Sequence, residues 1–222
     1  QQHLIGEGKV LRKLIQSGNI PSVIFWGPPG VGKTSLARFI AEQIHLPFYQ
    51  LSAIDSGVKE VRRVIDEATT NGKAILFIDE IHRLNTTVEE YLYSAMEDFY
   101  IDILIDQGPK ARSVKIKLPK FTLVGSTTRE GLLTAPFRSR FGVLEKLEFY
   151  PWEDLYKIVC NSARILSIQI DEKGAEIIAK RSRGTPRIAN RFLRRIRDVA
   201  QVRGNDLINE ELAHMGLEML GV

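Results

Sequence analysis

The chain has 222 residues, 44% hydrophobic and 26% charged, with a formal net charge of +4. This composition is ordinary for a globular protein of one large or two modest domains, and the mild charge permits an anionic partner without requiring one. No apolar stretch reaches membrane-spanning length, the start is not a signal peptide, and a single cysteine, Cys160, excludes an internal disulfide. We therefore expect a reduced, cytoplasmic protein that does not bind membranes, with Cys160 as a small core residue.

Helical and strand patterns alternate up to about residue 150. The predicted helices lie at 8–17, 35–44, 58–68 and 88–99, with Thr86 or Thr87 as the cap of the last. The predicted strands lie at 23–26, 48–53, 74–78, 121–126 and 143–149, and a hairpin is predicted at 101–105 and 113–118 around Gly108-Pro109. This alternation predicts an α/β three-layer domain over residues 1–150 with a mainly parallel sheet.

The pattern changes after Pro151. Helical patterns occupy 152–167, 172–181, 187–203 and 209–220, and no strand is evident. We predict a small, all-helical second domain over residues 151–222.

A glycine-rich loop directly follows the strand at 23–26. Its sequence, Gly27-Pro-Pro-Gly-Val-Gly-Lys33-Thr34, fits G-x-x-x-x-G-K-T, and a helical pattern begins where it ends. Glycines let backbone N–H groups curl around a phosphate chain, the lysine brings a cation to the β- and γ-phosphates, and the threonine hydroxyl is a ligand for Mg²⁺. The alternative is a Gly/Pro-rich turn that contains Lys-Thr by chance, but such a turn would not be expected between a strand and a helix. The sequence therefore predicts a nucleotide site.

Two carboxylates end the apolar strand 74–78. Asp79 is placed to act on Mg²⁺ through water, and Glu80 to polarise the water that attacks the γ-phosphate. Alone, such a pair is often a solvated strand end, but its position downstream of Lys33 in an alternating chain favours catalysis. Asp79-Glu-Ile-His82 also fits the DExH box of two-lobed helicases. The rest of the chain has no strands for a second lobe, so we reject that interpretation.

Four further residues are candidates for sensing or stabilising the γ-phosphate. Thr128 follows the strand 121–126, where the alternative is a simple Ser/Thr turn. Arg138 and Arg140 precede Phe141-Gly142 and are either surface charges or include an arginine finger for a neighbouring subunit. Arg187, near the start of a helix, is placed to fold over a bound nucleotide.

The combination of these motifs resembles the AAA+ ATPases over essentially the whole chain. The resemblance implies ATP or ADP with Mg²⁺ between the two domains, and a ring homo-oligomer that is a hexamer when active. It implies Glu80 as catalytic carboxylate, Thr128 as sensor 1, Arg140 as a finger acting in trans and Arg187 as sensor 2. The implied metal residues are Thr34 and Asp79, and the implied nucleotide-binding residues are Gly27, Pro28, Pro29, Gly30, Val31, Gly32, Lys33, Thr34 and Ser35.

Residues from about 75 to 222 resemble the RuvB family of Holliday-junction branch-migration ATPases. The resemblance rests on stretches such as Leu76-Phe-Ile-Asp-Glu-Ile-His-Arg-Leu-Asn85 and Arg138-Ser-Arg-Phe-Gly142. It implies an adenine pocket containing Ile5, Tyr150 and Pro186. It also implies that the 101–118 hairpin corresponds to the RuvB insertion that contacts RuvA. Ile101, Ile103 and Ile105 are predicted to share one face of that hairpin. This face either contacts a partner or packs on the sheet.

Residues 1 to about 70 resemble instead the RarA/MgsA family, clamp-loader-related ATPases of replication and recombination. The matching stretches are His3-Leu-Ile-Gly-Glu-Gly-Lys9 and Leu51-Ser-Ala-Ile-Asp-Ser-Gly-Val-Lys-Glu-Val-Arg62. We therefore hypothesise a chimera with a seam between about 70 and 85, a divergent natural paralogue being the alternative.

We expect the Mg·ATP-hydrolysing core of a RuvB-like motor. RuvB proteins continue into a winged-helix DNA-binding domain, which this sequence lacks, so DNA contact is expected to be weak or indirect. The alternatives are a RarA-like ATPase, or a nucleotide-dependent scaffold or chimera with little turnover. The four histidines lack partners at metal-ligand spacing, so we expect no zinc. Arginines at 181, 183, 187, 191, 194, 195, 197 and 203 form either a nucleic-acid patch or, as their spread around a helix favours, a solvated or subunit-facing surface.

Overall fold

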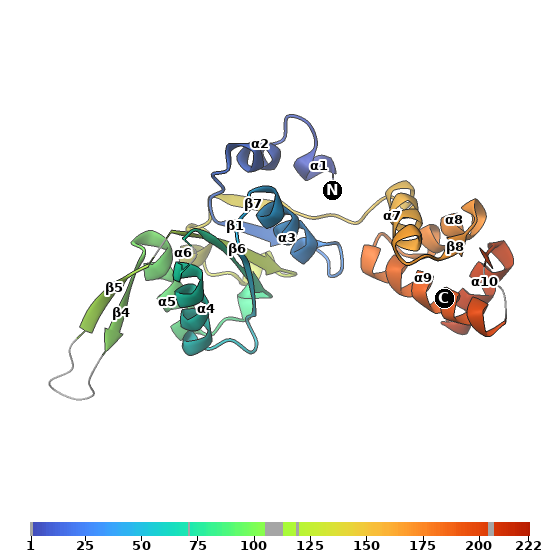
Figure 1. Cartoon of the computed structure of the whole chain (residues 1–222). Coiled ribbons are helices and arrows are strands. Elements are labelled where there is room, and N and C mark those ends of the chain that lie inside the picture. Colours follow the sequence, from blue (N-terminus) through green and yellow to red (C-terminus); the bar gives the residue numbers. More distant parts are fainter. Residues whose placement is uncertain (1, 71, 105–112, 119, 204–206) are drawn as a thin grey trace. The chain divides into compact units, whose positions relative to one another are not determined.

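The computed structural model describes residues 2–70, 72–104, 113–118, 120–203 and 207–222. The chain forms two compact units, whose helices and strands are labelled in Figure 1. The first comprises Gln1–Gly27 and Lys33–Leu147, and the second Pro28–Gly32 and Glu148–Val222. The apex of the glycine-rich loop therefore groups with the C-terminal helices, whereas both of its ends belong to the first unit.

A five-stranded parallel sheet forms the centre of the first unit, in the order β2-β3-β6-β1-β7. The strands are β1 (Val23–Trp26), β2 (Phe48–Ser52), β3 (Ala74–Asp79), β6 (Phe121–Thr127) and β7 (Val143–Lys146). The predicted parallel α/β sheet is confirmed, although β7 ends at Lys146 and not at Phe149. Because every strand runs the same way, the carboxyl ends of β1, β3 and β6 meet at one edge.

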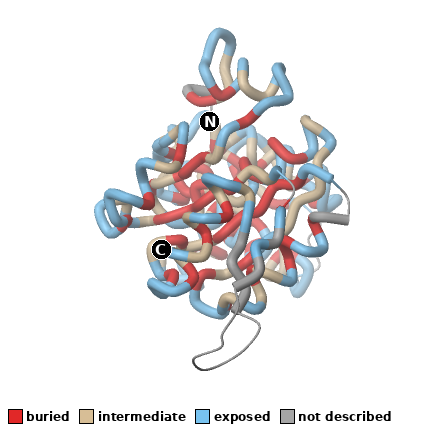
Figure 2. The backbone as a smooth tube through the Cα atoms, turned by 90° about the vertical axis from the view of Figure 1, so that its left-hand side faces the viewer, coloured by how far each residue is buried: buried red, intermediate tan, exposed pale blue. Residues whose placement is uncertain are grey.

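Helices cover both faces of this sheet, because its apolar side chains alternate between the faces. Leu76 and Ile78 pack into the cluster that includes α4 and α5, whereas α3 contacts β3 and β6. β3 is buried from Ala74 to Ile78, and such buried positions are red in Figure 2. The helices of this unit are α1 (Gln2–Ile5), α2 (Val10–Ser17), α3 (Lys33–Gln43), α4 (Val58–Thr70), η1 (Ile81–Arg83), α5 (Thr86–Glu97), η2 (Glu130–Leu132) and α6 (Ala135–Arg138).

The cap of α5 differs from the prediction. The Asn85 side chain accepts a hydrogen bond from the Val88 N–H at 2.9 Å, whereas Thr86 and Thr87 are already helical. Asparagine is a preferred N-cap residue because its short side-chain oxygen reaches these unpaired N–H groups. The predicted cap at Thr86 or Thr87 is therefore wrong by one or two positions.

The predicted hairpin is present as β4 (Tyr100–Leu104) and β5 (Ser113–Lys117), which pair antiparallel with Tyr100 opposite Lys117. It extends away from the sheet of the first unit in Figure 1. The predicted turn at Gly108-Pro109 lies outside the described residues. So does the predicted shared face, because Ile105 and the side chains of Ile101 and Ile103 are not described.

The second unit is a helical bundle around a core that includes Val159, Ile178, Phe192 and Ile196. Cys160 is a half-buried free thiol packed against this core. The helices are α7 (Trp152–Ile165), α8 (Glu172–Arg181), α9 (Pro186–Val202) and α10 (Glu210–Met219). The prediction of no strands here is wrong in one detail, since β8 (Gln169–Ile170) and β9 (Leu207–Ile208) form a short parallel pair. Two-residue strands are too short to leave a periodic signal.

In the ranges that the structure describes, none of the helices has the length and apolarity needed to cross a bilayer.

Candidate functional site

The glycine-rich loop begins in a backbone conformation that only glycine adopts readily. Gly27 has a φ of 140°, and a Cβ there would lie 2.1 Å from the Leu147 carbonyl oxygen, beyond the end of β7. Lys33 opens α3 and donates from Nζ to the Gly27 carbonyl at 2.8 Å, with 7% of the residue exposed. Thr34 is half-buried and Ser35 exposed in the same first turn, whose N–H groups favour an anion. A buried cation and a helix N-terminus therefore converge at the end of β1.

The loop apex contacts the start of α9 within the second unit. The Arg187 N–H donates to the Gly30 carbonyl at 3.4 Å, and Thr185 is the residue before α9. Tyr150 donates its N–H to the Gly184 carbonyl at 2.9 Å, and Pro186 is the first residue of α9. Pro186 and Arg187 thus lie on one short stretch that meets the apex, and Tyr150 contacts the start of that stretch. The Arg187 side chain is exposed. Ile5, the third residue predicted near adenine, is half-buried in α1 of the first unit.

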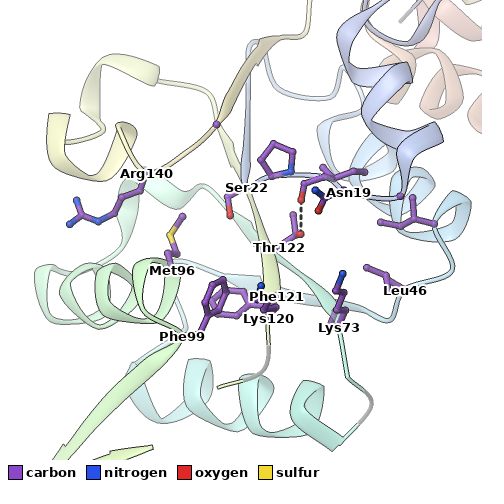
Figure 3. A pocket seen from close by; sticks show the side chains of 16 residues that line it. Asn19, Ser22, Leu46, Lys73, Met96, Phe99, Lys120, Phe121, Thr122 and Arg140 are labelled. Atoms are coloured by element: carbon purple, nitrogen blue, oxygen red, sulfur yellow. Dashed lines mark hydrogen bonds between the residues drawn. The ribbon is translucent and has the colours of Figure 1, made fainter. Parts of the chain in front are cut away.

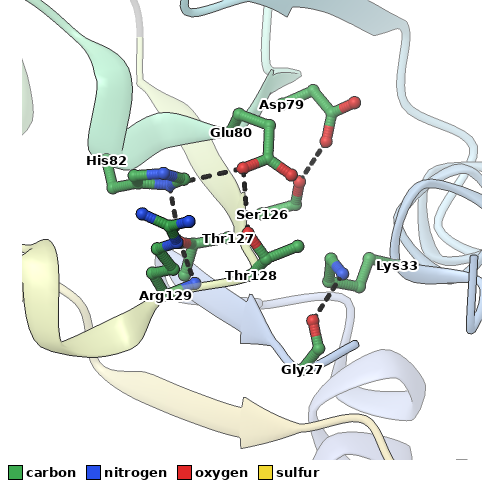
Figure 4. Close-up of polar contacts among 9 residues, drawn as sticks. All are labelled: Gly27, Lys33, Asp79, Glu80, His82, Ser126, Thr127, Thr128 and Arg129. Atoms are coloured by element: carbon green, nitrogen blue, oxygen red, sulfur yellow. Dashed lines mark hydrogen bonds and ion pairs between the residues drawn. The ribbon is translucent and has the colours of Figure 1, made fainter. Parts of the chain in front are cut away.

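The predicted carboxylates stand at the end of β3, next to β6 (Figure 4). Ser126 donates a hydrogen bond from its hydroxyl to Asp79 Oδ1. Thr128 donates from Oγ1 to Glu80 Oε2 at 3.2 Å. Glu80 has a φ of 52°, which is uncommon for a residue other than glycine, and such conformations concentrate at functional sites. The structure therefore brings Asp79, Glu80 and Thr128 together, as the sequence predicted.

His82 adds a side chain to this group that the sequence reasoning did not assign to it. Its Nδ1 lies 2.8 Å from Thr127 Oγ1 and 3.4 Å from Glu80 Oε2. Burial lowers the pKa of His82, with Arg83 and Arg129 acting in the same direction against the opposing effect of Glu80. The only sign of this group in the sequence is the run Ser126-Thr-Thr128. The contacts of Ser126 with Asp79 and of Thr127 with His82 depend on the register of β3 with β6, which the sequence does not reveal.

Arg140 lies at the opposite edge of the sheet from these residues. With Ser22 and Thr122, which stand where β1 and β6 begin, it lines a pocket of about 370 Å³ (Figure 3). Its guanidinium donates to the Pro136 carbonyl at 2.6 Å, pairs with Glu97 at 2.9 Å and lies 4.2 Å from the centre of the Tyr93 ring. The structure therefore does not bring Arg140 to the Asp79–Glu80–Thr128 group of its own chain.

A magnesium ion fits the residues at the carboxyl edge only together with a phosphate ligand. In the part of the chain that the structure describes, no three His, Cys, Asp or Glu residues are grouped to hold a metal. Mg²⁺ is commonly bound by one or two protein oxygens completed by water and substrate phosphates. The Asp79 carboxylate and the Thr34 hydroxyl are a donor set of that kind.

Comparison with known proteins identifies the family. The model of the Holliday junction DNA helicase RuvB P-loop domain matches residues 13–147, and that of the RuvB AAA lid domain matches residues 150–222. The chain belongs to the RuvB family. A Holliday junction branch migration complex subunit RuvB from Methanoregula boonei is 53% identical over 203 residues, which is 91% of this chain and 60% of that protein. The chain thus spans less than two thirds of this curated relative.

Solved RuvB structures have the same fold. The Thermotoga maritima RuvB Holliday junction branch migration motor superposes with a TM-score of 0.79 at 40% identity, covering 95% of this chain and 65% of that chain. A mutant of Thermotoga maritima RuvB gives a TM-score of 0.82 at 40% identity, covering 95% of this chain and 67% of that chain. The RuvB-type AAA+ core and helical lid predicted from the sequence are therefore confirmed.

The predicted RarA segment and chimera are not supported. One RuvB family model runs without a break from residue 13 to 147, across the proposed seam at 70–85. The RuvB relative likewise aligns over 203 residues of the chain. The apparent change from RarA-like to RuvB-like sequence rested on short N-terminal stretches within a core that both families share. Such stretches are too short to assign a family.

Proposed function

We propose that this chain is the ATP-hydrolysing core of a RuvB-type motor that drives branch migration of Holliday junctions. The observation that supports this most is the gathering of Lys33, Asp79, Glu80 and Thr128 at the carboxyl ends of β1, β3 and β6. Open α/β sheets bind ligands at this edge. The relatives named above are branch-migration proteins, which supplies the substrate class.

In this proposal, the loop residues 27–35 bind the phosphates of ATP. Lys33 carries the positive charge toward the β- and γ-phosphates, while Thr34 and Asp79 hold Mg²⁺. When bound, Mg²⁺ neutralises charge on the phosphate oxygens. Glu80 orients the attacking water and accepts its proton, and Thr128 fixes the Glu80 carboxylate through the hydrogen bond to Oε2.

Residues 1–150 and 151–222 act as the ATP-binding and lid domains. Tyr150 and Pro186, together with Ile5, flank the adenine. Arg187 reports the nucleotide state, because its backbone already meets the loop apex at Gly30.

Arg140 acts on the ATP of a neighbouring subunit. It stands at the amino edge of the sheet, whereas Glu80 stands at the carboxyl edge. An arginine finger stabilises transition-state charge only within contact distance of the γ-phosphate. A ring of identical subunits, a hexamer when active, provides that contact, and the β4–β5 hairpin is a docking element for a RuvA-type partner.

The test is steady-state ATP hydrolysis over a range of protein concentrations, with and without branched DNA. Specific activity is expected to rise cooperatively with concentration, because each active site needs two subunits. Hydrolysis proportional to protein concentration in a sample that native mass spectrometry shows to be monomeric would overturn the trans role of Arg140. ATP binding without turnover under any of these conditions would make the chain a nucleotide-dependent scaffold instead.

A further inference from the structure

The His82 side chain is largely buried within the polar group at the carboxyl edge. It is 5% exposed, compared with 29% for Glu80. The ring belongs to η1, directly after β3, and it reaches Thr127 at the end of β6 (Figure 4). A buried imidazole needs hydrogen-bond partners, because an unpaired polar atom away from water is costly.

We infer that His82 is a positioning residue for Glu80, linking the carboxylate on β3 to the buried Thr127 hydroxyl on β6. One nitrogen, Nδ1, faces both groups, at 2.8 Å from Thr127 Oγ1 and 3.4 Å from Glu80 Oε2. Thr127 Oγ1 also accepts the Arg129 N–H at 2.9 Å, so the hydroxyl is itself fixed. This inference rests on the proposed ATPase function.

The contacts give the two oxygens of the Glu80 carboxylate different roles. Thr128 Oγ1 and His82 Nδ1 both approach Oε2 of Glu80. Oε1 is therefore the oxygen left to accept the proton of the attacking water. Holding one oxygen fixes the direction of the other, and catalysis by a general base depends on that geometry before it depends on pKa.

The tertiary packing determines where the ring stands. Gly125 of β6 lies under Ile81, and a Cβ at Gly125 would approach Ile81 Cδ1 to 2.7 Å. A side chain at Gly125 would therefore press against Ile81, which lies between Glu80 and His82. The same close approach brings both polar side chains to the end of β6.

The neutral imidazole suits this role. The charged groups that act on His82 are Glu80, Arg83 of η1 and Arg129 after β6, and burial outweighs the attraction of Glu80 in lowering the pKa of His82. Protonation at low pH would place a cation against Oε2 and make the carboxylate a weaker base. The hydrolysis rate is therefore expected to fall on acidification as His82 becomes charged.

The experiment compares His82→Ala and His82→Asn with wild type and with His214→Asn, which changes an exposed histidine on α10. Asparagine keeps a polar group near the position of Nδ1. His82→Ala is expected to lower kcat about 10-fold, within the contribution of a positioned base, with KM for ATP and ATP affinity within about 2-fold of wild type. His82→Asn is expected to recover most of that loss, and His214→Asn to match wild type.

The pH profile of kcat separates positioning from a merely structural role. The acid limb seen in wild type is expected to move down by about one pH unit or more in His82→Asn, since the titrating imidazole is gone. An unchanged profile together with an unchanged kcat in a folded His82→Asn or His82→Ala protein would overturn the inference. If wild type itself does not hydrolyse ATP, the proposed function fails and not this inference alone.

Discussion

Thr128 and Glu80 come from two different strands, yet the Thr128 hydroxyl donates a hydrogen bond to Glu80 Oε2 at 3.2 Å. Strand β6 lies between β1 and β3 in the sheet, so Thr128 stands between the glycine-rich loop and the carboxylates. A hydroxyl there can respond to the γ-phosphate and hold the catalytic carboxylate at the same time.

Thr128→Val should lower kcat for ATP hydrolysis about 10-fold or more while ATP affinity stays near that of wild type. Valine keeps the shape of threonine but cannot donate to Glu80 Oε2, so only the hydrolysis step loses support. Steady-state kinetics and a direct binding measurement check this. Thr128→Ser, which keeps the hydroxyl, should recover most of the rate, and equal losses in both variants would contradict the role of the hydrogen bond.

Lys33→Ala should weaken ATP binding by about 3 kcal/mol, roughly 100-fold in Kd, because a buried cation facing the phosphates is removed. Isothermal titration calorimetry with ATP in excess Mg²⁺ measures this directly. Lys59→Ala, on the exposed surface of α4, is the matched control and should bind ATP as wild type does. Unchanged affinity in a folded Lys33→Ala protein would contradict the assignment of the loop.

Arg140→Ala should abolish most hydrolysis and be rescued by mixing with Glu80→Gln. In mixed rings, the Glu80→Gln subunit supplies its intact Arg140 to a neighbouring site that still has Glu80. Arginine fingers contribute about 10³- to 10⁵-fold to kcat, so the regained activity is easily measured. Arg138→Ala, an exposed arginine 3.8 Å from Glu130, is the control and should retain activity. A failure of the mixture to regain activity would argue against action in trans.

The sequence predicted most of what depends on local pattern. The five sheet strands and the longer helices follow from periodicity, and the loop at 27–34 follows from its own spacing. At the candidate site, the features that it missed depend on contacts between distant residues. His82 and Thr127 meet only because β3 pairs with β6, and Arg140 lies at the far edge only because β7 runs parallel to β1. The family of the first 70 residues was misjudged because short matching stretches carry little information.

Tyr91→Phe should change stability at alkaline pH and little else. Burial raises the pKa of Tyr91 from 10.0 to about 12, and its hydroxyl has no hydrogen-bond partner among the described residues. The native state holds this proton more tightly than the unfolded state. The contribution of the protonated Tyr91 to the free energy of unfolding is therefore fully present below pH 10 and is lost as the pH rises through about 12.

Chemical denaturation of wild type and Tyr91→Phe between pH 7 and 12 tests this range. At pH 7 the free energy of unfolding of Tyr91→Phe should equal that of wild type or exceed it by up to about 1 kcal/mol, because no hydrogen bond is lost. Above pH 10 its free energy of unfolding should fall less steeply. Tyr100→Phe, at an exposed tyrosine, is the control. Parallel curves for wild type and Tyr91→Phe would contradict the buried phenol.

The most direct test of the ATP site is single-turnover hydrolysis of Mg·ATP by wild type and Glu80→Gln, with ATP affinity measured on the same samples. Glutamine fills the same space but cannot accept a proton from water. We predict equal affinity and a hydrolysis rate at least about 100-fold lower in the variant. Equal hydrolysis rates in the two proteins, or no ATP binding by wild type, would contradict the account.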